Sequence, residues 1–332
     1  MTQDRAVLVA RQVFPEVVQR LREHFLVETN DEPVDWPQGE LIRRLHGKAG
    51  VFVAGVEPID KRLLDACPQL RAVCSMAVGY NNIDVAACTT RGVLVTNAPD
   101  VLTETTADFG FALMMATARR ISESEHFLRS GQWSRWSYDL FAGADIHGAT
   151  LGVLGMGRIG QAIARRGALG FGMPVLYANR SRLPADIEQR LGAVWVSKEE
   201  LLQRADHVVV VAPYSAQTHH LVGARELALI KPTATLTNIA RGGVVDDAAL
   251  AVALRERRIA AAGLDVFEGE PQVHPDLLAL ANVVLTPHIA SASLPTRRAM
   301  ANLAADNLIA VLSGGKPLTP VNPQVLGSAP RA

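Results

Sequence analysis

The sequence predicts an α/β protein with two doubly wound parallel sheets. Short runs rich in Val and Leu alternate with longer helical patterns, which is typical of parallel βαβ units. There are eleven such runs, more than one ordinary open sheet holds, so we expect two sheets. A length of 332 residues also suits two domains that each bury their own core.

The expected strands form two series, and long helical patterns bracket the second one. These patterns cover residues 102–121 and 294–315, and we expect them to be crossings between the domains, with the later one returning to the first sheet. The first series comprises residues 6–10, 50–54, 71–77 and 92–97. The second comprises residues 150–155, 174–179, 193–196, 207–212, 234–240, 261–267 and 283–288.

Composition limits the partners and the compartment. Basic and acidic residues balance at 33 each, so nothing indicates a basic face for nucleic acid. Cys67, Cys74 and Cys88 lack metal-ligand spacing and suit buried thiols in a reducing compartment. The N-terminal sequence lacks signal-peptide order, and no apolar run approaches the roughly 18 residues that span a bilayer. We therefore expect a cytoplasmic protein without a membrane partner.

A glycine motif follows the first strand of the second series. Gly155, Gly157 and Gly160 have the spacing G-x-G-x-x-G between a strand and an Ala-rich helix, which is the order that a dinucleotide site requires. The first two glycines let the backbone approach a pyrophosphate, and the third lets helix and strand pack closely. The helix N-terminus adds N–H groups and a positive dipole.

Two arginines stand where this motif ordinarily has an acidic residue. About 20 residues after Gly160, an Asp or Glu would bind the ribose 2′-hydroxyl of NAD. This chain instead has Arg180 and Arg182, and a guanidinium can bind a 2′-phosphate with forked hydrogen bonds. We predict a preference for NADP(H), with NAD(H) as the alternative if the arginines only coat a solvated loop.

Three further polar residues each come just after a strand of the second series. They are Arg241, Glu270 and His288, although a single Arg at such a place can also be structural. Open α/β sheets bind ligands at this edge. Arginine binds a carboxylate through two hydrogen bonds, and histidine titrates near neutral pH and can donate a proton. A neighbouring carboxylate favours the protonated imidazole. The set suits reduction of a 2-oxo acid.

The remaining polar and sulfur residues have simpler interpretations. The other eight histidines, including His219 and His220, show no metal-like partners at helical spacing, so we expect solvated or capping roles and no metal. Met114 and Met115 suit core packing. Asp246 and Asp247 suit the N-cap of the next helix.

Several segments resemble the D-isomer-specific 2-hydroxyacid dehydrogenases. The signature segments are LGVLGMGRIGQAIA, NIARGGVVDDAAL, AAGLDVFEGEP and VVLTPHIASAS, and AVGYNNIDVAA and VLTETTADFGFALMMATARR are similar to the first domain and its crossover helix. The resemblance runs from about residue 45 to 323. Within the family it is strongest to bacterial glyoxylate/hydroxypyruvate reductases of the 2-ketogluconate reductase type.

The resemblance implies a discontinuous, flavodoxin-like substrate domain of residues 1–100 and 291–332, into which a Rossmann cofactor domain of residues 101–290 is inserted. It implies NADPH-dependent reduction of glyoxylate, hydroxypyruvate or 2-ketogluconate to D-2-hydroxy acids. Arg241 would then bind the substrate, His288 would be the general acid and Glu270 would support His288. The backbone N–H groups of Val78 and Gly79 would bind the substrate carboxylate.

The resemblance also implies cofactor contacts and a homodimer. The residues are Gly157, Arg158 and Ile159 at the pyrophosphate; Asn179, Arg180, Ser181 and Arg182 at the 2′-phosphate; Pro213 by the adenosine; and Ile239, Asp265 and Ala290 near the nicotinamide. Residues 131–148 resemble the arm that packs across the family's dimer interface. Trp136 or Phe141 would reach the partner's site.

Other members of this fold provide the alternatives. Formate dehydrogenases of this fold have Gln where this chain has Glu270, which disfavours that activity. Phosphoglycerate dehydrogenases usually prefer NAD and often carry a regulatory extension, and we expect this chain to end too early for such an extension. An NAD-dependent dehydrogenase of another substrate range thus stays open. So does a nucleotide-sensing protein like the related transcriptional corepressors, because these can retain the Arg, Glu and His.

Overall fold

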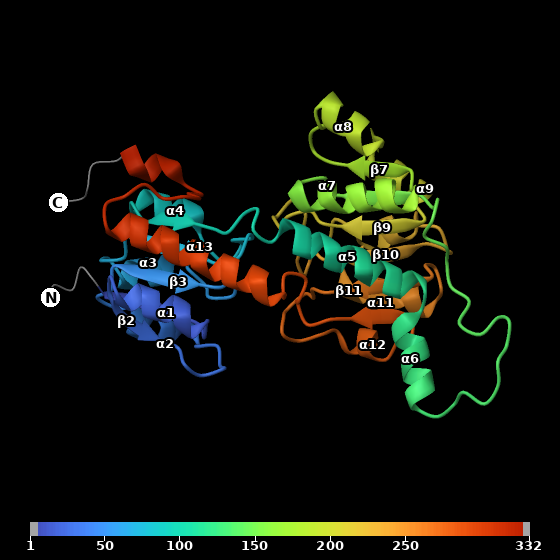
Figure 1. Cartoon of the computed structure of the whole chain (residues 1–332), viewed down its shortest axis with the longest axis horizontal. Coiled ribbons are helices and arrows are strands. Elements are labelled where there is room, and N and C mark those ends of the chain that lie inside the picture. The colour runs from blue at the N-terminus through green and yellow to red at the C-terminus, as the bar shows by residue number, and fades with distance from the viewer. Residues whose placement is uncertain (1–5, 328–332) are drawn as a thin grey trace. The chain divides into compact units, whose positions relative to one another are not determined.

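The computed structural model describes residues 6–327 and divides into two compact units (Figure 1). The first unit contains Met1–Leu102 and Ser293–Ala332, and the second contains Thr103–Ala292. Each unit has its own parallel sheet with helices on both faces. The predicted fold class, α/β with two doubly wound parallel sheets, is confirmed.

The first unit has a five-stranded sheet in the order β2-β1-β3-β4-β5, which is the flavodoxin-like order. Its strands are β1 (Ala6–Val9), β2 (Leu26–Thr29), β3 (Gly50–Val53), β4 (Ala72–Ser75) and β5 (Leu94–Thr96). One face carries α1 (Pro15–Arg22) and α13 (Leu294–Leu312), and the other carries α2 (Gln38–Leu45), α3 (Lys61–Ala66) and α4 (Val85–Thr90). A short 3-10 helix, η3 (Pro323–Gly327), follows.

Helix α13 returns the chain to this first sheet, as the sequence predicts. Its buried face packs on β3 and β4, and it includes Met300, Ala304 and Leu308. Gly50 permits this close approach, because a Cβ there would lie 2.7 Å from Cδ1 of Leu308. The small residues of α13 and Gly50 therefore bring helix and sheet into tight contact.

The second unit has a seven-stranded sheet in the order β12-β11-β10-β9-β6-β7-β8. Since β6 lies between β9 and β7, the strand order reverses beside the first strand, as in the Rossmann fold. The strands are β6 (Leu151–Leu154), β7 (Val175–Ala178), β8 (Ala193–Trp195), β9 (His207–Val210), β10 (Thr235–Asn238), β11 (Ala261–Leu264) and β12 (Val283–Leu285).

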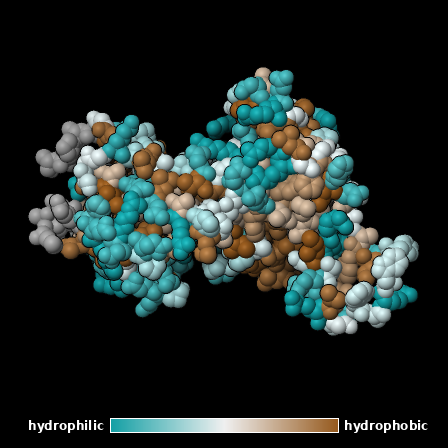
Figure 2. Space-filling model, in the orientation of Figure 1, coloured by the Kyte–Doolittle hydropathy of each residue, from teal (hydrophilic) through white to brown (hydrophobic). Residues whose placement is uncertain are grey.

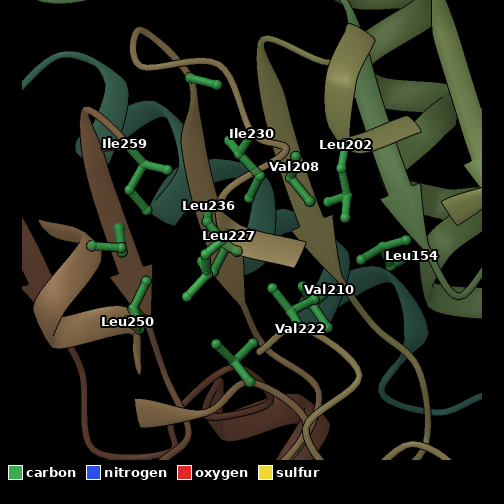
Figure 3. Close-up of a cluster of buried hydrophobic side chains, with 14 of the residues drawn as sticks. Leu154, Leu202, Val208, Val210, Val222, Leu227, Ile230, Leu236, Leu250 and Ile259 are labelled. Carbon is green, nitrogen blue, oxygen red and sulfur yellow. The ribbon is translucent and has the colours of Figure 1, made fainter. Parts of the chain in front are cut away.

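Two apolar clusters cover the two faces of this sheet. The first involves α5 (Thr103–Ala118), α7 (Arg158–Arg165) and α8 (Ala185–Leu191), and it includes Met114 and Met115, as predicted. The second involves α9 (Lys198–Arg204), α10 (Ala224–Leu227), α11 (Asp247–Arg255) and α12 (Pro275–Leu278), and Figure 3 shows its interdigitated Leu, Val and Ile side chains. Helix α6 (Ile121–Arg129) and the π-helical turn η2 (Arg166–Gly170) complete the unit.

All eleven expected strands are present, but a twelfth, β2, was not predicted. It is a four-residue edge strand whose residues are all at least partly exposed and which contains Glu28, so it lacks the buried apolar run on which the other predictions rest. The three cysteines are free and buried, as expected. Among the described helices, none combines the length and apolar character needed to cross a membrane.

The expectation for the histidines is wrong for His207. It lies on β9 and is fully buried, not solvated. Its ring nitrogens are 2.8 Å from Oγ1 of Thr235 and 2.9 Å from the carbonyl of Asp145. His274, in contrast, does cap α12, where Nδ1 accepts from the N–H of Asp276.

Candidate active site

The glycine motif forms a tight turn between β6 and α7. Gly155 has a φ of +102°, and a Cβ there would lie 2.6 Å from the backbone nitrogen of Ala212. A Cβ on Gly160 would collide with the carbonyl of Gly155. Apart from Gly157 itself and its two chain neighbours, no described residue has an atom within 4 Å of a Cβ built on Gly157, which is the N-cap of α7. The turn therefore leaves open space at a helix N-terminus, which fits a pyrophosphate.

Asn179 follows β7 and stabilises this turn. Its Oδ1 accepts a hydrogen bond of 2.7 Å from the N–H of Met156, between the first two glycines. The next two residues, Arg180 and Ser181, are exposed. Within residues 6–327, Arg180 makes no hydrogen bond or ion pair, so its guanidinium is available to a ligand.

Arg182 differs from Arg180 because it is already paired. Its guanidinium donates to both carboxylate oxygens of Glu188, at 2.8 to 3.1 Å. Glu188 is only 8% exposed, and it also accepts from the hydroxyl of Tyr177 at 2.6 Å. The hydrogen bonds from Arg182 and Tyr177 hold the pKa of Glu188 below its usual range. Of the two arginines, Arg180 is therefore the one without an internal partner.

Asp265 follows β11 and holds the loop that contains His288. Its buried carboxylate accepts from the Thr286 hydroxyl at 2.7 Å and from the N–H groups of Ile289 and Ala290, both at 2.8 Å. Burial raises the pKa of Asp265, although these hydrogen bonds oppose the shift. The carbonyl of Asp265 also accepts from the N–H of His288. Asp265 thus holds the loop that contains His288 in place. The sequence predicted only that Asp265 would lie near the nicotinamide and did not indicate this structural role.

His288 and Glu270 form a hydrogen-bonded pair. Nδ1 of His288 lies 2.7 Å from Oε2 of Glu270, whose Oε1 accepts from the N–H of Phe267 at 3.0 Å. His288 has a φ of +53°, an unfavourable conformation for a residue with a Cβ, and such strain is concentrated at functional sites. Among the described residues, Nε2 has no protein partner, and the side chain is 43% exposed. This nitrogen can therefore face a substrate.

Arg241 adds positive charge to this pair. It follows β10 and is partly buried, and its Nη1 donates to the carbonyl of Ala240 at 2.7 Å. Burial lowers the pKa of Arg241, while the charge of Glu270 opposes that shift, and a guanidinium remains protonated in either case. Burial alone would raise the pKa of Glu270, but His288, the Phe267 N–H and Arg241 together lower it. Glu270 is therefore ionised at neutral pH.

Val78 and Gly79 belong to the other unit, after β4. Their N–H groups donate no hydrogen bond within the described part of the chain, whereas the Val78 carbonyl accepts from Asn97 at 2.8 Å. Two unpaired, adjacent N–H groups at the carboxyl end of a parallel strand are suited to an anion.

The remaining expected cofactor residues also lie at the carboxyl edge of the seven-stranded sheet or beside it. Arg158 and Ile159 begin α7, so their N–H groups lie in the first turn, where a helix has no internal acceptors. Pro213 is exposed after β9, and its carbonyl accepts from Thr218. Ile239 and Ala290 are buried.

Sequence reasoning missed part of the support around Glu270. Asp246 caps α11 through the N–H of Ala249, as expected, but Asp247 has a separate role. Its buried carboxylate accepts from the N–H of Glu268 at 2.9 Å and so fixes the segment that leads to Glu270. The only signal in the sequence was that Asp246 and Asp247 are adjacent, although a helix needs a single N-cap residue.

For His219 and His220 the sequence shows no metal-like partner at helical spacing, and the structure adds a neighbour that is distant in the sequence. In the structure, Glu268 lies beside both histidines, and ligand atoms of the three residues are within 4.8 Å of one another. Glu268 is 48 residues from His220 in the sequence, so helical spacing could not reveal the group.

The second unit thus combines a glycine turn and a group of Arg, Glu and His at the carboxyl edge of one parallel sheet, which is the arrangement expected of a nicotinamide-dependent oxidoreductase. Residues 111–290 match the family model of the D-isomer specific 2-hydroxyacid dehydrogenase, NAD binding domain. The chain belongs to this family. It is an NAD(P)-dependent D-2-hydroxyacid dehydrogenase, a class that reduces 2-oxo acids.

Known proteins are similar over nearly the whole chain. A glyoxylate reductase of Thermococcus onnurineus is 47% identical over 324 residues, which is 96% of each chain. The structure of an NADPH-dependent glyoxylate/hydroxypyruvate reductase of Sinorhizobium meliloti, in complex with NADP and malonate, is 37% identical, with a TM-score of 0.86 and 99% of each chain covered. A glyoxylate reductase of Paecilomyes thermophila is 31% identical, with a TM-score of 0.86 and coverage of 96% and 99%.

The pair of Glu270 and His288 predicts a shifted pH profile in Glu270→Gln. The carboxylate is ionised at neutral pH and stabilises the protonated imidazole, which reduction of a carbonyl requires. Without this charge the imidazole should lose its proton more readily. As the pH rises, kcat for reduction should therefore begin to fall at a lower pH in Glu270→Gln than in the wild type. Steady-state kcat across pH 5 to 9 measures the shift. Glu199→Gln, at an exposed position on α9, is the control, and identical profiles for all three proteins would contradict the pairing.

Proposed function

We propose that this protein reduces glyoxylate and hydroxypyruvate to glycolate and D-glycerate with NADPH, with 2-ketogluconate as a further substrate. The observation that carries the proposal is the 2.7 Å pair of His288 and Glu270 beside Arg241. The relatives described as glyoxylate reductases and as an NADPH-dependent glyoxylate/hydroxypyruvate reductase support this substrate range.

Each polar residue has a distinct task in this proposal. Arg241 binds the substrate carboxylate and polarises the carbonyl through a forked pair of hydrogen bonds. His288 donates the proton on Nε2 to the carbonyl oxygen, and Glu270 holds the ring through Nδ1 and stabilises its charge. A bound dihydronicotinamide supplies the hydride for the carbonyl carbon. The N–H groups of Val78 and Gly79 bind the other side of the carboxylate.

The cofactor is held by the second unit in this proposal. Gly155, Gly157 and Gly160, with the first-turn N–H groups of Arg158 and Ile159, bind the pyrophosphate. Arg180 binds the 2′-phosphate, with Ser181 beside it, and Asn179 supports the turn through Met156. Arg182 contributes positive charge while it stays paired with Glu188. The other contacts are Pro213 at the adenosine and Ile239, Asp265 and Ala290 at the nicotinamide end.

Removing the general acid tests the reaction itself. His288→Ala should reduce kcat for glyoxylate by at least about 10²-fold, since general acid catalysis contributes 10² to 10⁴. The Kd for NADPH, measured by fluorescence titration, should stay within about threefold. His46→Ala, at another exposed histidine, is the control and should retain full kcat.

Two results would contradict that assignment: an unchanged kcat in His288→Ala, or wild-type protein that binds NADPH but turns over none of glyoxylate, hydroxypyruvate and 2-ketogluconate. The second result would favour a nucleotide-sensing protein on the same fold.

The different environments of the two arginines predict unequal effects on cofactor choice. Arg180→Ala should raise the KM for NADPH by about tenfold or more and leave the KM for NADH nearly unchanged. The substitution removes the guanidinium that has no internal partner. Arg182→Ala should have a smaller effect on NADPH, because its guanidinium is shared with Glu188. The measurement is KM for both cofactors. Equal NADPH and NADH constants in the wild type, or no change in Arg180→Ala, would refute the predicted preference.

We also propose a homodimer formed through residues 131–148. This segment exposes large side chains, including Trp136 at 77% and Tyr138. Figure 2 shows hydrophobic and hydrophilic residues intermingled on the face of the molecule in view. Phe141 instead packs on Phe127 and under Arg120, so Trp136 is the better candidate to reach the partner. Light scattering should give twice the monomer mass for the wild type and a larger monomer fraction for Trp136→Ala with Tyr138→Ala. A monomeric wild type would disprove the proposal.

A further inference from the structure

Three loops at the carboxyl edge of the seven-stranded sheet meet at a small cluster of polar side chains. His219 and His220 are on the loop after β9, Gly243 is on the loop after β10, and Glu268 is on the loop after β11. One ligand atom from each of His219, His220 and Glu268 lies within 4.8 Å of the other two. These residues have no task in the dehydrogenase reaction described above.

The rings of the two histidines are already oriented by their neighbours. They stack with centroids 3.9 Å apart and an interplanar angle of 24°. Nε2 of His220 is 2.9 Å from Oε2 of Glu268, while its Nδ1 faces Oδ2 of Asp246 at 3.6 Å. Nδ1 of His219 lies 3.4 Å from the Tyr214 hydroxyl. A carboxylate behind the ring of a ligating histidine is the usual outer-shell arrangement of metal sites.

The backbone beneath the cluster is fixed. The N–H of His220 donates to the Gly243 carbonyl at 2.7 Å, and the N–H of Glu268 donates to Asp247 at 2.9 Å. Gly243 has a φ of +75°, and a Cβ there would lie 3.4 Å from Nδ1 of His219 and 3.7 Å from Oε1 of Glu268. A glycine at this position therefore leaves room for both side chains on a rigid base.

We propose that His219, His220 and Glu268 bind one divalent transition-metal ion of the Zn²⁺ type. Two imidazoles and a carboxylate are the ligands that Zn²⁺ accepts, and three protein ligands leave its fourth position to water. A tetrahedral ion with bonds of about 2.0 to 2.2 Å holds its ligand atoms about 3.3 to 3.6 Å apart, so small side-chain movements would replace the 2.9 Å contact between His220 and Glu268 with bonds to the ion. His219 and Glu268 are exposed and can make these movements.

The bound ion joins loops that also carry residues of the active site. Glu268 precedes Glu270 by two residues, Gly243 follows Arg241 by two, and the histidines share the loop that contains Pro213. The ion itself lies outside the group of His288, Glu270 and Arg241. Its role is to hold these loops together, and it takes no part in hydride or proton transfer.

Metal binding to the full-length, chelator-treated protein tests this proposal. Isothermal titration with Zn²⁺ should give one ion per chain, and Co²⁺ at the same site should give the visible absorption bands of a four- or five-coordinate ion. His219→Ala and Glu268→Gln should each weaken Zn²⁺ binding by at least about tenfold. His126→Ala, which removes an exposed histidine on α6, is the matched control and should bind as the wild type does.

A second variant tests the outer-shell carboxylate without unfolding α11. Asp246→Ser keeps a side-chain oxygen for the N-cap but removes the charge behind His220, so we expect Zn²⁺ to bind about 10- to 100-fold more weakly. Zn²⁺ should also raise the Tm of the wild type and have little effect on that of His219→Ala.

Three outcomes would overturn the proposal: no saturable Zn²⁺ binding, equal affinity in the wild type and in both ligand variants, or an equal loss in His126→Ala. The last result would mean that exposed histidines bind the metal without a defined site.

Discussion

The seven parallel strands of the second unit require that every loop following a strand emerges at the same edge of the sheet. This constraint places the glycine turn after β6, Arg180 after β7, Arg241 after β10 and His288 after β12 at one edge of this sheet, although they are far apart in the sequence. A parallel sheet needs helices on both faces, so these loops cannot be short hairpins. The loops at this edge are therefore long enough to carry functional side chains, and they lie close enough together for these side chains to form one site.

The loops at this edge are held by buried carboxylates. Asp265 accepts three hydrogen bonds from the segment that carries His288, and Asp247 fixes the backbone before Glu270. These contacts hold His288 at a φ of +53°, a conformation that costs of order 1–3 kcal/mol for such a residue and persists only where the surroundings enforce it. The loop thus fixes the position of His288, and in the proposed reaction this reduces the reorganisation needed for proton donation.

The sequence was sufficient for the features that depend on local pattern. Continuous apolar runs located eleven strands, and the spacing of Gly155, Gly157 and Gly160 located the dinucleotide turn. The sequence was not sufficient for features that depend on burial or on partners distant in the chain. The strand β2 is a short, exposed edge strand, and His207 is buried through contacts to Asp145 and Thr235. Glu188 accepts hydrogen bonds from Arg182 across an irregular loop. The group of His219, His220 and Glu268 exists only because β9 and β11 end at the same edge. Such contacts follow from the fold and not from residue spacing.

The most direct test of this account is the product formed from hydroxypyruvate and NADPH deuterated at the transferable position of C4. Hydride transfer to a substrate held by Arg241, with proton donation from His288, should give D-glycerate that carries one deuterium at C2. Chiral chromatography with mass spectrometry identifies both the isomer and the label. Formation of L-glycerate, D-glycerate without deuterium, or no product would contradict the assignment of this site as a D-specific 2-oxo acid reductase.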